Sequence, residues 1–145
     1  MENASEKIGV RTPEIPSGAQ VAGVGIDLES VSRIRDAATR HGDAFLSKVF
    51  FPEEIELCRS RGAHVWESLA ARWAAKEAFS KALGTGIGET VGFTDFAVLS
   101  DAHGAPRPVF SPHGRAALHN AGANRALVSL THTADFAEAI VILLS

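Results

Sequence analysis

The stretch RWAAKEAFSKALGTGIG, residues 72–88, shows most directly how this chain folds. It predicts a long helix from about residue 65 to residue 83, ended by Gly84, because glycine readily takes the left-handed conformation that closes a helix. At about 100° per residue, small side chains gather on one face that can approach a β-sheet closely: Ala71, Ala75, Ala78, Phe79 and Ala82. The opposite side is expected to carry Trp73, Glu77, Ser80 and Lys81, with Arg72 and Lys76 at its edge.

Glu77 and Lys81 lie one helical turn apart and allow two interpretations. As an exposed ion pair they would contribute only about 0.2–0.5 kcal/mol, and taken alone this is the better interpretation. The alternate glycines of residues 84–88 are more than a helix end requires, and their backbone N–H groups could bind phosphate oxygens. The loop lacks the Lys-Ser/Thr ending of a P-loop, so it is not specific without further residues.

Asp27 supplies a second carboxylate, at the end of a predicted glycine-containing strand, VAGVGID at 21–27. Two carboxylates with waters and substrate phosphates make a typical magnesium site, and Asp27 could meet Glu77 across a contact between helix and sheet. Asp is also a preferred helix cap, and a helix is expected to begin near Ser30. The spacing favours neither interpretation over the other.

His132 follows an apolar strand and stands between Thr131 and Thr133. A lone histidine at a strand end is usually a hydrogen-bonded surface residue. The two hydroxyl groups make a role in phosphate binding or proton transfer plausible without being specific for it.

The remaining pattern predicts an α+β fold in which an antiparallel β-sheet packs against the long helix. Residues 1–20 are expected to form a flexible tail, and residues 21–145 a single domain. Within that domain we expect helices near 30–40, 52–60 and 112–121, a short amphipathic segment at 42–50, and strands near 95–100, 107–110, 126–133 and 136–144.

Composition excludes several classes of protein. The net charge of -3 offers no general attraction to nucleic acid. The single cysteine, Cys58, excludes an internal disulfide and a multi-cysteine zinc site. We expect no signal peptide and no membrane span, because the strongest apolar run, 137–144, is too short to cross a bilayer. The cytoplasm is therefore the expected compartment.

Three segments together resemble the holo-[acyl-carrier-protein] synthases, the small bacterial 4′-phosphopantetheinyl transferases. They are Gly-Ile-Asp at 25–27, the helix and loop at 72–88, and Ser-Leu-Thr-His-Thr at 129–133. Their order and spacing agree with the family over about residues 21–144. The resemblance implies the 4′-phosphopantetheinyl transferase fold and transfer of phosphopantetheine from coenzyme A to a serine of apo acyl carrier protein. An inactive carrier-binding scaffold and a coenzyme A-binding regulator are the alternatives.

The resemblance also implies roles for particular residues. Asp27 and Glu77 would hold magnesium (Mg²⁺), and Lys81 would face the pyrophosphate. The coenzyme A pocket would be lined by Arg72, Ser80, Lys81, Gly84, His132 and Thr133. Arg33, with Arg40 beside it, would meet the carrier protein, and the enzyme would be a homotrimer with sites between subunits. Glu77, a water held by the metal and His132 all remain candidates for the proton acceptor.

Overall fold

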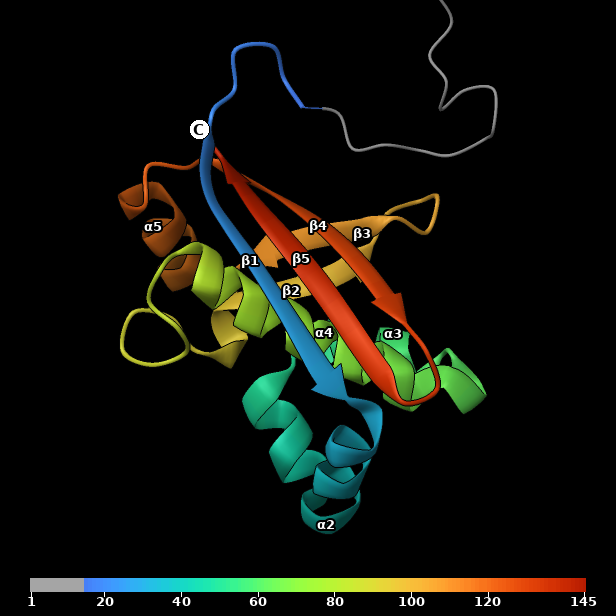
Figure 1. Cartoon of the computed structure of the whole chain (residues 1–145). Coiled ribbons are helices and arrows are strands. Elements are labelled where there is room, and N and C mark those ends of the chain that lie inside the picture. Colours follow the sequence, from blue (N-terminus) through green and yellow to red (C-terminus); the bar gives the residue numbers. More distant parts are fainter. Residues whose placement is uncertain (1–14) are drawn as a thin grey trace, which may run out of the picture.

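The central strand of the main sheet comes from the end of the chain. In this computed structural model, which describes residues 15–145, β5 (Phe136–Leu144) pairs with both β1 (Val21–Ser30) and β4 (Arg125–His132). Both pairings are antiparallel (Figure 1). Most of the predicted tail, residues 1–14, lies outside the described residues.

A separate two-stranded hairpin, β2 (Phe96–Ser100) with β3 (Pro106–Phe110), lies beside this sheet. Its turn is held by Asp101, whose Oδ1 accepts the N–H groups of His103 and Ala105. The predicted antiparallel strands are therefore confirmed, with ends that differ by a residue or so, except that β1 continues past Asp27 to Ser30.

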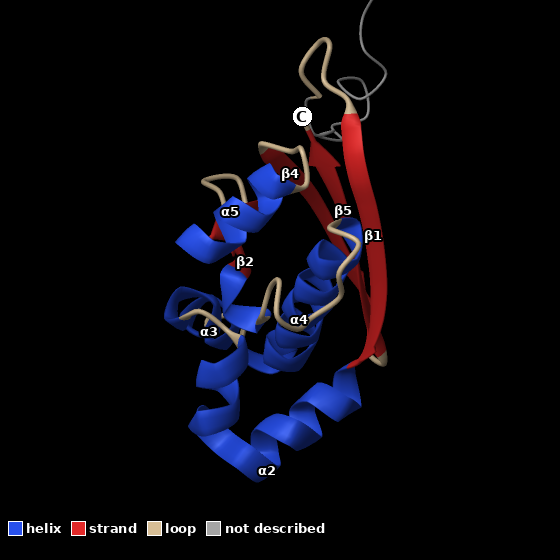
Figure 2. Ribbon diagram, turned by 90° about the vertical axis from the view of Figure 1, so that its left-hand side faces the viewer, coloured by secondary structure: helices blue, strands red, loops and turns tan. Residues whose placement is uncertain are grey.

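The long helix α4 (Val65–Ala82) lies between the three-stranded sheet and the other helices, as Figure 2 shows edge-on. Two glycines of β1 allow the close approach. A Cβ atom on Gly23 would overlap the carbonyl oxygen of Ala82, and one on Gly25 would overlap that of Ala78. The predicted packing of the alanine face on the sheet is confirmed, and the α+β fold class with it.

Three further helices surround α4: α2 (Val31–Val49), α3 (Pro52–Arg59) and α5 (Pro112–Asn120). Ser30 caps α2, and its Oγ accepts the N–H of Arg33 at 3.3 Å. The helix bends at Gly42, where φ is 61°, so the two segments predicted at 30–40 and 42–50 form one kinked helix. Single 3-10 turns at Gly62–His64 and Phe93–Asp95 complete the described elements.

The prediction of one polar side on α4 is wrong for part of that side. Arg72, Lys76 and Ser80 are all buried, at 5%, 1% and 0% exposure. Arg72 and Lys76 contact α3 and β2, because α4 is covered on both sides and not only by the sheet.

Lys76 forms an interior ion pair that the sequence did not indicate. Its Nζ donates to Glu54 Oε1 at 2.7 Å and to the Phe96 carbonyl oxygen at 2.6 Å. Glu54 also accepts the N–H groups of Phe51 and Val98. Each charged group therefore has several partners, which offsets the cost of removing it from water.

Candidate active site

Asp27 and Lys81 form the centre of the candidate site, where β1 lies against α4. Lys81 Nζ donates to Asp27 Oδ1 at 2.9 Å and to the Ile26 carbonyl oxygen at 3.2 Å. Asp27 stands inside β1, opposite Ala139 of β5. Since Ser30 caps α2, the interpretation of Asp27 as a helix cap is wrong. The hydrogen bond to Asp27 raises the pKa of Lys81, which keeps its ammonium group charged.

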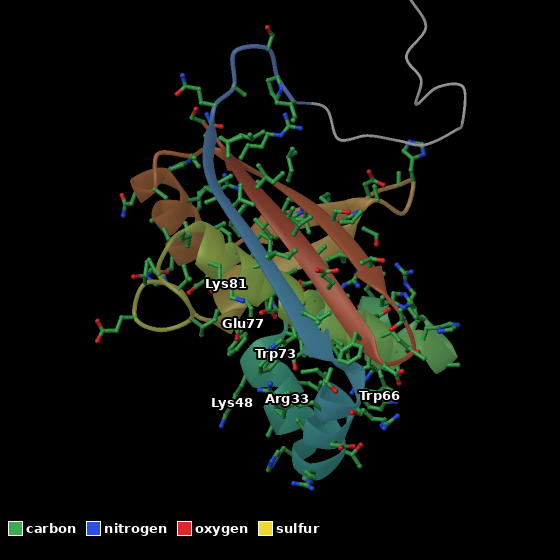
Figure 3. The ribbon with its side chains drawn as sticks, in the orientation of Figure 1. Arg33, Lys48, Trp66, Trp73, Glu77 and Lys81 are labelled. Carbon is green, nitrogen blue, oxygen red and sulfur yellow. The ribbon has the colours of Figure 1, made fainter. Side chains whose placement is uncertain are left out.

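Glu77 lies one turn before Lys81 on the same side of α4, as Figure 3 shows. Burial raises the pKa of Glu77 above its ordinary value, and the nearby Asp27 carboxylate raises it further, while Lys81 opposes both. Asp27 therefore lies near enough to Glu77 for the two charges to interact. The expected ion pair within the helix is absent, because the ammonium of Lys81 pairs with Asp27.

These two carboxylates fit a divalent cation. Asp27 Oδ2 is buried and has no hydrogen-bond partner among the described residues, which is costly unless a further partner is provided. Within residues 15–145, no group of three or more His, Cys, Asp or Glu side chains could hold a metal ion. Two protein oxygens with substrate phosphates and water are a typical set for Mg²⁺, which a dedicated protein cage rarely holds.

The glycine-rich loop after α4 differs from its predicted form. The N–H of Gly84 bonds to the Lys81 carbonyl, and those of Thr85 and Gly86 bond to the Ser80 carbonyl. The N–H of Gly88 bonds to Val91. These N–H groups are therefore engaged, because the last carbonyl groups of a helix need donors. Gly84 and Gly86 have φ angles of 80° and 69°, which let the chain turn sharply after the helix. The positive charge beside the loop comes from Lys81, in the last turn of α4.

Arg72 and Ser80 lie inside this chain. Arg72 donates through Nε to the Val98 carbonyl at 3.0 Å and through a terminal nitrogen to the Ser68 carbonyl at 3.2 Å. The hydroxyl of Ser80 donates to the Glu77 carbonyl at 2.6 Å. Both side chains therefore donate to backbone carbonyl groups inside the protein. Their expected contact with coenzyme A stays a prediction.

Arg33 lies at the same edge as Glu77 and is anchored by a residue that sequence reasoning missed. Glu29, on the α4-facing side of β1, accepts a 3.3 Å hydrogen bond from Arg33. The Glu29 side chain is nearly buried, whereas Arg33 is 69% exposed. Arg33 and Arg40 both border a shallow hollow of about 420 Å³ on α2. Only the pairing of β1 with β5 as far as Ser30 places Glu29 on the inner face, so no local signal could have identified it.

His132 and Thr133 lie at the other edge of the sheet. His132 is exposed and aligned with Ala137 of β5, which is aligned in turn with Glu29 of β1. Two strand spacings, about 10 Å, therefore separate His132 from β1. The hydroxyl of Thr133 accepts the N–H groups of Asp135 and Phe136 and so holds the turn between β4 and β5.

Cys58 takes no part in this site. It is fully buried, and burial raises the pKa of its thiol to about 11. A protonated thiol is a poor nucleophile.

The fold belongs to a known class of protein. Residues 23–140 match the family model of the 4′-phosphopantetheinyl transferase superfamily, and the chain belongs to that superfamily. The resemblance predicted from the three sequence segments is thereby confirmed.

Within the superfamily, the chain is similar to proteins named holo-[acyl-carrier-protein] synthase. A holo-[acyl-carrier-protein] synthase of Koribacter versatilis is 44% identical over 125 residues, which are 85% of this chain and 98% of the relative. The crystal structure of the holo-[acyl-carrier-protein] synthase of Neisseria meningitidis has a TM-score of 0.77 and 35% identity, covering 86% of this chain and 98% of that one. The Helicobacter pylori synthase, solved in complex with coenzyme A, has a TM-score of 0.73 and 33% identity, covering 84% and 99%.

Among the described residues, no helix is both long enough and apolar enough to cross a membrane.

Proposed function

We propose that this protein is a holo-[acyl-carrier-protein] synthase. It transfers 4′-phosphopantetheine from coenzyme A to a serine of apo acyl carrier protein and releases adenosine 3′,5′-bisphosphate. The observation that carries the proposal is the cluster of Asp27, Glu77 and Lys81 between β1 and α4. Two carboxylates beside one ammonium group suit a cation and a pyrophosphate, and the relatives that share this fold carry the same name.

In this proposal Asp27 and Glu77 hold Mg²⁺. The unpartnered Oδ2 of Asp27 supports that assignment, since a cation would satisfy it. When bound, the ion neutralises pyrophosphate oxygens and stabilises charge on the leaving group. Lys81, half exposed in the last turn of α4, adds a compact positive charge for the same phosphates.

The transfer forms a bond from the carrier serine oxygen to the phosphorus that bears pantetheine. The bond from that phosphorus to the bridging oxygen breaks, and its electron pair leaves with adenosine 3′,5′-bisphosphate. The serine proton needs an acceptor, because a neutral hydroxyl is a weak nucleophile. Glu77 is one candidate, and a water held by the metal is another. His132, whose side chain is exposed and makes no hydrogen bond with a described residue, is the third candidate.

Arg33 and Arg40 provide the docking surface for the carrier. Both are exposed on α2, and Arg33 lies near the edge that bears Glu77 (Figure 3). Carrier proteins are generally acidic, so two guanidinium groups would attract them and speed their encounter.

The proposal includes a homotrimer with sites between subunits. The outer face of the three-stranded sheet exposes Val24, Ile26, Leu28 and Phe136, an apolar surface of the kind that usually marks an interface. His132 and the carboxylates lie at opposite edges of one sheet, so a site that uses both would draw them from neighbouring copies. Light scattering should give three times the chain mass, and a monomer would refute this part.

We place the reaction in the cytoplasm, where coenzyme A and newly made carrier meet.

One experiment tests the transfer. The protein is incubated with coenzyme A, Mg²⁺ and an apo carrier protein, and the carrier is weighed by mass spectrometry. We expect the carrier to gain one phosphopantetheine with the native protein and none with Glu77→Ala, which should fold normally because Glu77 is partly exposed. If the native protein bound both substrates and modified no carrier, the scaffold or the regulator would replace the enzyme.

A further inference from the structure

Lys81 already serves Asp27 as a counter-ion. Its ammonium group donates to one oxygen of that carboxylate and to the carbonyl of Ile26. The Lys81 side chain is 51% exposed and that of Asp27 only 14%, so the ammonium covers the carboxylate from the solvent side. The half-exposed lysine therefore joins α4 to β1 at the protein surface.

This contact affects any cation that approaches the two carboxylates. Asp27 and Glu77 together would offer two negative charges, but with the ammonium attached to Asp27 the three groups carry a net charge of -1. An arriving divalent cation would be repelled by the ammonium and would compete with it for Asp27. A pyrophosphate offers that ammonium a second acceptor of greater charge, and it offers the cation further oxygens.

We propose that Lys81 makes binding of the divalent cation depend on coenzyme A, because its ammonium group stays on Asp27 Oδ1, beside the oxygen left for the cation, until a pyrophosphate draws it away. The inference rests on the proposed function. Lys81 then has two acceptors in turn, Asp27 in the free protein and the pyrophosphate in the complex. The cation is bound weakly by the free protein and firmly once coenzyme A is present.

The size of the effect follows from Coulomb's law. A divalent cation and an ammonium about 5 Å apart, in a nearly aqueous medium and with some screening by salt, repel each other enough to change affinity about tenfold. Replacement of Lys81 by a neutral side chain of similar length should therefore strengthen cation binding to the free protein. Loss of a phosphate-binding lysine should at the same time weaken binding of coenzyme A. These opposite directions separate the proposal from a general loss of structure.

The test uses Mn²⁺ as the probe, followed by electron paramagnetic resonance, with the full chain and without carrier protein. Mn²⁺ is titrated with and without coenzyme A, and a titration without protein corrects for Mn²⁺ held by coenzyme A alone. Without coenzyme A, Lys81→Met should bind Mn²⁺ about tenfold more tightly than the native protein. Coenzyme A should then strengthen Mn²⁺ binding about tenfold less in the variant than in the native protein.

Two variants serve as controls. Lys81→Arg keeps the charge and should bind Mn²⁺ as the native protein does. Lys48→Met removes one exposed charge from the last turn of α2, where Lys48 has no ion pair with a described residue. It changes the net charge by the same amount and should leave Mn²⁺ binding unchanged. Urea unfolding verifies that each variant is folded.

Equal or weaker Mn²⁺ binding by Lys81→Met without coenzyme A, with a native protein that transfers phosphopantetheine, would overturn this inference alone. If Lys48→Met strengthened Mn²⁺ binding as much as Lys81→Met, the effect would be one of net charge and the inference would fail. A native protein that bound no Mn²⁺ even with coenzyme A would remove the proposed metal site, and the inference with it.

Discussion

Gly25→Ala tests how the fold brings the two carboxylates together. Gly25 lies in β1 two residues before Asp27, and its backbone contacts α4 at Ala78 and Ala82. An added methyl group would overlap the Ala78 carbonyl oxygen and would stand 2.7 Å from the amide nitrogen of Ala82. Both are backbone atoms of a helix, so neither can rotate aside, and the helix must move away from the sheet.

The size of the effect can be worked from these contacts. An ordinary contact at a Cβ atom is 3.4–4 Å, so the overlap with the Ala78 oxygen requires α4 to withdraw by roughly 1.5 Å. Overpacking of this kind costs about 1–3 kcal/mol, and rigid backbone neighbours favour the upper value. Since Asp27 is on β1 and Glu77 on α4, the same shift separates the two carboxylates. A displacement of about 1 Å can lower a catalytic rate about 100-fold.

Urea unfolding and the mass-spectrometric transfer assay measure these two effects separately. We expect the unfolding midpoint of Gly25→Ala to fall by about 1–2 M urea and transfer to fall about 100-fold in protein that is still folded. Gly88→Ala is the matched control for stability, because a Cβ atom there meets nothing within 4 Å. Its midpoint should stay the same or rise slightly. Native stability and native transfer in Gly25→Ala would refute the argument that close packing of helix and strand positions the carboxylates.

Three further predictions concern the interior and the surface. Lys76→Met should cost about 3–5 kcal/mol in urea unfolding, because it leaves the buried Glu54 carboxylate without its cation; adding Glu54→Gln should recover part of that loss, and simply additive losses would contradict a direct pairing. Burial alone would raise the pKa of Asp95, but hydrogen bonds from Gly92, Ser111 and His113 outweigh burial and hold it below its usual value. The stability that this carboxylate contributes is therefore present above the unfolded pKa of about 3.9 and lost as pH falls through the lower folded pKa. Asp95→Asn should then be less stable than the native protein at pH 7, by about 1–3 kcal/mol, and the difference should shrink below about pH 4; an equal difference at both pH values would show that the charge is not involved. Arg33→Glu should weaken binding of an acidic carrier several-fold, and less so at high salt, while calorimetric binding of coenzyme A stays unchanged; equal losses for both ligands would remove Arg33 from the docking surface.

Sequence patterns predicted the elements of this fold well where the signal was local. The helix that ends before Gly84 and the strands near 95–100 and 107–110 each depend on residues close in sequence. The prediction was wrong at Ser80, because periodicity assumes that a helix buries one face. It was also wrong about the free N–H groups of the glycine loop, because the helix end needs those donors for its own carbonyl groups.

The sequence alone was sufficient for the class of protein, the order of strands and helices along the chain, and the candidate carboxylates at Asp27 and Glu77. Short motifs and backbone propensities carry that information, and both act over a few residues. The partners of the charged groups came only with the three-dimensional structure. Lys81 pairs with Asp27, 54 positions away, in preference to Glu77 on its own helix, and Lys76 pairs with Glu54 inside the protein. Such choices depend on which elements pack together and on how much water they exclude, and that becomes definite only when the glycines of β1 let α4 lie against the sheet.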